Sequence, residues 1–172
     1  MIQVFFFLSA NASEDIWRDV ELTYLKGLKS IAVGDTASFQ FWGEYEKELM
    51  IPKQKIKNLI ECKFRMSGIE VFDRRQHPLR RDAADLSVDF KFLKIEPQYG
   101  VIYISFRIYE TGHIERNNLY TSGKTWERFA MLTYSKNPDS EKEIVNLIND
   151  WMDEFSNLYL EANPRKFIPE DD

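Results

Sequence analysis

The sequence of 172 residues has one cysteine and only two histidines. A single cysteine, Cys62, excludes a disulfide framework within the chain and any multi-cysteine zinc or iron–sulfur site. Glycine and proline are scarce, at 7 and 6 residues. No apolar run approaches the length of about 18 residues that spans a bilayer. We therefore expect no metal, no cofactor and no stable membrane insertion.

Apolar and aromatic residues, by contrast, make up 44% and 15% of the chain. This composition is typical of a folded domain rather than a disordered segment, and the length suits a single domain. The formal charge is −5, from 23 basic and 28 acidic side chains. We expect no nucleic acid partner, because binding to a phosphate backbone depends mainly on an excess of positive charge.

The first twelve residues have the features of an incomplete signal peptide. Residues 2–9 are apolar, and Ala10-Asn11-Ala12 is a small-x-small pattern of the kind that signal peptidase accepts. No basic residue precedes the run. We predict cleavage after Ala12, with 13–172 as a single exported domain, periplasmic or secreted. The alternative is that 2–9 form a first strand of a cytoplasmic protein, since valine and phenylalanine favour sheets.

Two segments have the periodicity of amphipathic helices. One covers about 139–162, with a capping box formed by Ser140 and Glu143 at its start. The other begins after Pro52 and stops at Gly68, a residue suited to the left-handed conformation that ends helices. We predict an α+β fold in which these two main helices pack on one face of a sheet.

The sheet is predicted to be mixed or antiparallel, with about five strands. The segment 31–33, with an extension toward Phe41, is expected to pair with 69–72 across the first helix in a βαβ unit. Alternation of apolar residues and a Pro-x-x-Gly turn predict a hairpin. The two strands of this hairpin are 86–96 and 101–110. Two further strands, 119–121 and 126–134, are predicted on either side of a turn at Ser122-Gly123.

The candidate binding residues lie in one loop and on one strand. Arg74, Arg75, Arg80 and Arg81 form the one basic cluster of an acidic chain, so this loop could contact an acidic partner. A solvated connecting loop is the simpler interpretation. Tyr103 and Arg107 alternate with buried positions and face away from the predicted core.

Two other functions are compatible with the sequence. Glu61, Asp73, Asp89 and Lys91 could converge as a Mg²⁺-dependent nuclease centre of acidic ligands beside a lysine. An aromatic-lined pocket between helix and sheet could carry a small ligand. Neither histidine, His77 or His113, lies in a recognisable catalytic setting, so no catalytic residue is predicted.

Four segments are considered together: 25–33, 55–73 with its stretch Phe64-Arg65-Met66-Ser67-Gly68-Ile69-Glu70-Val71, Thr125-Trp126, and 153–164. They resemble a family of small exported bacterial proteins of unknown function. The resemblance covers most of 25–164 and implies an export signal, an α+β domain and an envelope location, but no catalytic residues. We therefore expect a non-enzymatic periplasmic or envelope interaction or accessory protein with a protein partner, and the sequence does not determine its oligomeric state.

Overall fold

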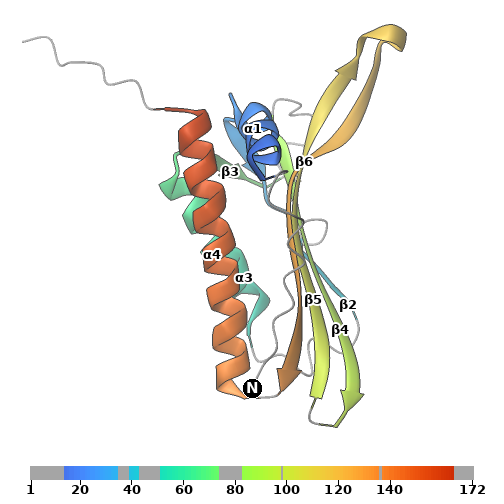
Figure 1. Ribbon diagram of the computed structural model, residues 1–172, viewed down its shortest axis with the longest axis vertical. Coiled ribbons are helices and arrows are strands. Elements are labelled where there is room, and N and C mark those ends of the chain that lie inside the picture. The colour runs from blue at the N-terminus through green and yellow to red at the C-terminus, as the bar shows by residue number, and fades with distance from the viewer. Residues whose placement is uncertain are drawn as a thin grey trace, which may run out of the picture.

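The protein has an α+β fold in which the helices lie on one face of a mixed sheet (Figure 1). The computed structural model describes residues 14–34, 39–42, 51–73, 83–97, 99–135 and 137–164. Their helices are α1 (Glu14–Leu25), α3 (Lys53–Met66), α4 (Pro138–Ala162) and the short 3₁₀ turn η1 (Glu115–Asn117). Their strands are β1 (Ser30–Ala32), β2 (Phe39–Trp42), β3 (Glu70–Phe72), β4 (Ala84–Glu96), β5 (Tyr99–Ile114) and β6 (Leu119–Ser135).

The sheet has the order β3-β1-β4-β5-β6, and β2 also pairs with β4. β1 runs parallel to β3 across α3, which confirms the predicted βαβ unit, and Gly68 ends the helix with a φ of +89°. The predicted extension of the first strand toward Phe41 is wrong, because this segment forms a separate strand, β2, that does not continue the pairing with β3. It lies parallel to β4, with Phe41 beside Phe90. The long strands β4, β5 and β6 form an antiparallel meander.

β6 is one strand rather than the predicted two. The predicted turn at Ser122-Gly123 is wrong, because both residues are paired with β5, opposite Thr111 and Glu110. The chain turns instead at η1, where Asn118 adopts a left-handed φ of 55°. The end of β5 and the start of β6, residues 109–124, consequently form a hairpin that projects from the body in Figure 1 and is called the hairpin arm.

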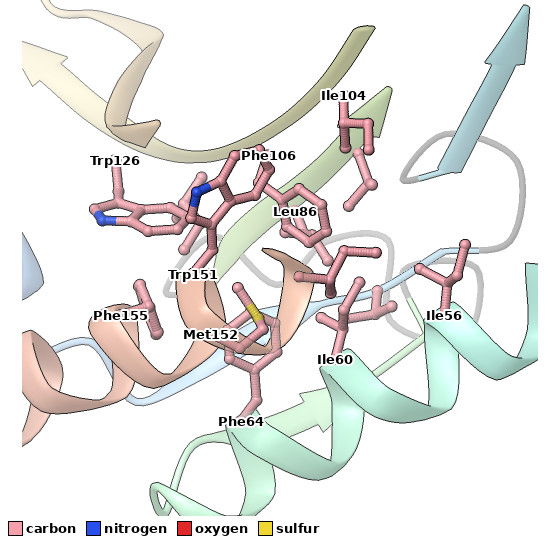
Figure 2. Close-up of a cluster of buried hydrophobic side chains, with 14 of the residues drawn as sticks. Ile56, Ile60, Phe64, Leu86, Ile104, Phe106, Trp126, Trp151, Met152 and Phe155 are labelled. Atoms are coloured by element: carbon pink, nitrogen blue, oxygen red, sulfur yellow. The ribbon is translucent and has the colours of Figure 1, made fainter. Parts of the chain in front are cut away.

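The core lies between the sheet and the helices. Along β5 the residues that face the helices are completely buried, as strand alternation predicts. Figure 2 shows these side chains meeting the apolar stripes of α3 and α4, and Phe155 stacks edge-on against both Phe64 and Trp126. The labelled core residues are Ile56, Ile60, Phe64, Leu86, Ile104, Phe106, Trp126, Trp151, Met152 and Phe155.

The start of α4 differs from the predicted capping box. Asn137 is the N-cap, and its Oδ1 accepts a hydrogen bond of 2.8 Å from the backbone N–H of Ser140. Ser140 itself is buried, with its hydroxyl 3.2 Å from that of Ser135. The cap therefore ties the helix to the end of β6, while the predicted end of the helix before Asn163 is confirmed.

Helix α1 lies in a segment where the sequence analysis expected no helix. Its residues Trp17 and Tyr24 are exposed, which blurs the apolar stripe, although Leu25 is completely buried. The helix is held by Arg128 of β6, which donates to Glu21 of α1 and also pairs with Glu154 of α4. Thus α1, α4 and β6 meet at one charged cluster on the inner side.

A candidate protein-binding face

The side of the sheet that faces away from the helices is called the outer face here. Strand register places its residues in rows that cross β2, β4, β5 and β6, because residues directly opposite one another point to the same side. Its residues are Gln40, Trp42, Ser87, Asp89, Lys91, Leu93, Val101, Tyr103, Ser105, Arg107, Glu127, Phe129, Met131 and Thr133.

An ion-pair cluster occupies the middle of the outer face. The guanidinium of Arg107 donates from Nε to Glu127 at 2.7 Å and from a terminal nitrogen to Asp89 at 2.9 Å. It also reaches the hydroxyl of Tyr103 at 3.3 Å. The buried hydroxyl of Ser105 donates to the same Asp89 oxygen at 3.4 Å. The cluster joins three adjacent strands and leaves the positive charge of Arg107 neutralised.

The electrostatics of the cluster favour its charged form. A hydrogen bond to Glu127 is the main reason that the pKa of Arg107 lies above its ordinary value. Burial opposes ionisation of Glu127, but hydrogen bonds and positive charge from Lys124 and Arg107 outweigh it, so the pKa of Glu127 is lowered. A fixed salt bridge of this kind holds side chains in place. It does not offer a proton for catalysis.

Large apolar side chains surround this cluster and are open to solvent. Phe129 and Met131 of β6 are 55% and 56% exposed, and Trp42 of β2 is 54% exposed. The ring of Phe129 lies 6.3 Å from that of Tyr103, and the ammonium of Lys91 lies 5.7 Å from the Tyr103 ring centre. An apolar patch this large on a sheet face is typical of an interaction surface.

The structure brings together two of the predicted binding residues, Tyr103 and Arg107. Arg74, Arg75, Arg80 and Arg81, like His77, lie outside the described residues, so their predicted role stays a prediction. The sequence analysis missed the apolar residues of the outer face. A signal was present in β6, where Phe129 and Met131 interrupt the expected apolar and polar alternation.

The acidic residues considered for a nuclease do not form a metal centre. Glu61 lies on α3, where it pairs with Arg65 at 2.9 Å and Lys57 at 3.8 Å. Asp89 lies on the outer face with its carboxylate bound to Arg107. Over the described ranges, no three histidine, cysteine, aspartate or glutamate side chains gather as metal ligands, which removes the nuclease arrangement that included Asp73.

The space between helices and sheet is filled by the core in Figure 2. A hollow of about 240 Å³ lies elsewhere, where α3 and α4 begin. It is smaller than a ligand pocket of about 300 Å³ or more and has no aromatic lining, unlike the predicted carrier site. Its lining residues are Ile51, Pro52, Lys55, Pro138, Glu141, Lys142 and Val145.

His113, for which the sequence predicted no catalytic role, lies on the hairpin arm. Its Nε2 is 2.8 Å from Asn118, and its ring lies 5.1 Å from that of Tyr120. Both contacts stabilise the turn of the arm. They place no nucleophile beside the imidazole.

None of the helices described above is both long and apolar enough to cross a membrane. A scan against protein-family models finds no match, and a search of curated proteins finds no relative either. Among solved structures, the chain is similar to a PelC dodecamer from Paraburkholderia phytofirmans, at 11% identity and a TM-score of 0.38, covering 92% of this chain and 98% of that one. It is also similar to a minor lipoprotein from Acinetobacter baumannii, at 12% identity and a TM-score of 0.34, covering 77% and 98%.

Proposed function

We propose that the chain is a protein-binding protein of the bacterial cell envelope, which contacts its partner through the outer face of the sheet. The observation that supports this most is the position of Trp42, Phe129 and Met131, which expose large apolar surfaces around an ion-pair cluster. Burial of apolar area is the main driving force of association, and this face offers it where the helices do not cover the sheet.

The size of the patch suits a protein partner. A half-exposed aromatic side chain offers about 100 Å² of contact area, so the apolar residues of the outer face offer about 500 Å² between them. With the polar residues between them, the contact approaches the roughly 800 Å² that each partner buries in an ordinary stable complex. A small ligand would cover only part of such a flat surface.

The charge of the outer face favours a neutral contact. Arg107 pairs with Asp89 and Glu127, and Lys124 also pairs with Glu127, so these four charges balance and a partner need not supply a strong opposite charge. The phenol of Tyr103 and the guanidinium of Arg107 lie at the centre, where interface residues contribute most to affinity. In this proposal these two residues fix the orientation of the partner, and the apolar residues supply most of the affinity.

The envelope location is supported by residues 1–12, whose apolar run and Ala10-Asn11-Ala12 suit export and cleavage. In this proposal the exported protein begins at Ser13. The mass of the N-terminal peptide, taken from cells that express the chain with its native upstream codons, tests this part alone. A chain that keeps residues 2–9 and stays in the cytoplasm contradicts export while leaving the binding proposal open.

Binding is tested by immobilising the purified chain, passing an envelope extract over it and measuring the affinity of any recovered protein in pure form. Replacing Phe129 and Met131 by serine should weaken that affinity by at least about thirtyfold, because truncating central apolar contacts costs about 2 kcal/mol or more. Tyr24→Ser is the matched control, since this exposed tyrosine lies on α1.

Two outcomes contradict this use of the outer face. One is an affinity unchanged in the Phe129 and Met131 variant and in Arg107→Ala. The other is a loss of binding only when Arg74, Arg75, Arg80 and Arg81 are all replaced by alanine, which would assign the contact to the basic loop.

A further inference from the structure

The hairpin arm, defined as residues 109–124, is exposed along nearly its whole length. Every residue from Thr111 to Lys124 is exposed, including the large apolar side chains of Ile114, Leu119 and Tyr120. A two-stranded hairpin is only marginally stable in water unless another strand or a core covers it. The arm projects away from the body in Figure 1. Something outside a single copy is therefore expected to cover it.

The arm continues directly into the edge of the body sheet. β6 is a strand of 17 residues, and no described strand pairs with its second edge. Its first part, 119–124, belongs to the arm, and its second part, 126–132, borders the body. An edge strand of this length is a ready template for another strand.

The two parts of β6 are complementary when the strand is laid antiparallel to itself. If Lys124 is placed opposite Glu127, then Ser122 falls opposite Phe129 and Tyr120 opposite Met131 on the outer face. On the inner face Leu119 falls opposite Leu132. Opposite charges and apolar side chains that face each other across a strand pair both stabilise it.

The bulge in β6 makes this register possible. In a regular strand, Lys124 and Glu127 point to opposite faces, because their numbers differ by three. The register shift beside Tyr109 leaves Thr125 as the extra residue of the ladder, so that Lys124, opposite Tyr109, and Glu127, opposite Arg107, both lie on the outer face. Away from the bulge, the arm and the body edge can then pair with side chains on matching faces.

Gly123 provides a second and independent observation. Its φ is not positive, and a Cβ added to it would meet no atom within 4 Å, so the single chain does not require glycine there. In the register above Gly123 falls opposite Arg128, whose side chain is held on the inner face by Glu21 and Glu154. A glycine at that point leaves room for this cluster.

We propose that β6 pairs antiparallel with β6 of a second copy of this chain, with Lys124 opposite Glu127 of the other copy. Each arm then lies along the body edge of its partner, and the two sheets become continuous around a two-fold axis beside Thr125. A second copy fits better than an unrelated strand because the interface is isologous, so one complementary strand supplies both sides of it. The outer faces of both copies stay on the same side of the joined sheet. This pairing does not depend on the function proposed above.

Mixing two charge-reversed variants of the full chain tests this register. In a homodimer of the Lys124→Glu variant, two glutamates face each other at both symmetry-related contacts. In a homodimer of the Glu127→Lys variant, two lysines do so. We expect each variant alone to dimerise at least about tenfold more weakly than the wild type in sedimentation equilibrium. Mixed in equal amounts, the two variants should form a heterodimer of near wild-type affinity, because every reversed pair is then matched. An effect confined to one chain cannot produce this recovery.

Gly123→Val tests the close approach to Arg128. It should weaken the dimer by at least about tenfold while the melting temperature of the monomer is unchanged, since the single chain leaves space at this position. Gly112→Val is the matched control, because Gly112 lies on β5, one strand away from the proposed contact.

Three results overturn the proposal. The first is a wild-type chain that sediments as a monomer at every concentration reached. The second is a dimer that the Gly123 variant leaves intact. The third is a pair of charge-reversed variants that fail to associate on mixing although both are folded by circular dichroism.

Discussion

The two faces of the same sheet behave in opposite ways although they alternate along the same strands. On the inner face of β5, Phe106 and its neighbours Ile104 and Ile108 are completely buried against the helices. On the outer face of β6, Phe129 keeps more than half of its surface exposed. The inner face holds the fold together, whereas the outer face carries apolar area that the single chain does not use.

The largest difference in stability between the two faces is expected from alanine variants of two phenylalanines on the adjacent strands β5 and β6. Phe106→Ala should lower the free energy of unfolding by about 3–5 kcal/mol, because it leaves a cavity beside Trp151. Phe129→Ala should change it by no more than about 0.5 kcal/mol. Urea unfolding of the two variants measures both values. A large loss in the Phe129 variant would mean that the outer face is part of the core.

A smaller effect is expected at Gly100, on the inner face of β5. A Cβ there would lie 2.5 Å from the ring of Phe92 and 2.8 Å from the carbonyl oxygen of Leu93. The missing side chain lets Phe92 reach across β5 to Tyr134, with ring centres 5.7 Å apart. Gly100→Ala should therefore cost about 1–3 kcal/mol.

Thermal unfolding of Gly100→Ala beside Gly123→Ala checks that prediction. Gly123 has open space around its Cα, so its alanine variant should melt like the wild type. Equal melting temperatures for the two alanine variants would show that Phe92 moves aside without cost.

The smallest effects concern two carboxylates on the two faces. Burial raises the pKa of Glu110, on the inner side at the base of the arm, and a hydrogen bond from Thr125 offsets this only in part. Its Oε1 is buried without a hydrogen-bond partner among the described residues. Glu127, on the outer face, has a lowered pKa. The ordinary value for both is 4.5.

The opposite directions give opposite dependences on pH. Glu127 contributes stability that is present above pH 4.5 and is lost as the pH falls through its lowered folded pKa. Ionisation of Glu110 costs stability above its raised folded pKa, and this cost disappears below pH 4.5. At pH 7, Glu127→Gln should therefore lose about 1 kcal/mol. Glu110→Gln should gain less than about 1 kcal/mol at the same pH.

Urea unfolding of both glutamine variants at pH 7 and again at pH 3 measures these differences. Both should be smaller at the lower pH. Glu110 has a raised pKa and is protonated there, and the stabilisation by Glu127 decreases as the pH falls below 4.5 toward its lowered pKa. Differences in unfolding free energy that are as large at pH 3 as at pH 7 would assign the effects to packing rather than to charge.

The sequence was most informative where one periodicity dominates. The span 139–162 was predicted almost to its ends, because apolar spacing and a proline mark the boundaries. The hairpin of β4 and β5 was also predicted, but β5 runs from Tyr99 to Ile114 rather than over 101–110, and Gly100, expected in the turn, is paired within the sheet. The helix after Pro52 and its stop at Gly68 were predicted for the same reason. Helix α1 was missed because its apolar stripe is interrupted by exposed aromatic residues and by polar ones.

Predictions failed where a local signal competed with long-range pairing. Ser122-Gly123 has the composition of a turn, but the ladder with β5 keeps both residues in a strand. The candidate binding face was likewise predicted only where the signal lies within one strand. Tyr103 and Arg107 could be placed by alternation along one strand, whereas Trp42 and Phe129 come from strands that only the fold brings near them.

Residue order by itself determined helices α3 and α4, the hairpin of β4 and β5 and the buried side of β5, because these depend on spacing along a few turns or one strand. Tertiary structure decided the rest. The ion-pair cluster of Asp89, Arg107 and Glu127 and the projection of the arm both depend on register between distant strands. Register is set by side chains that meet across the sheet rather than by neighbours in the chain.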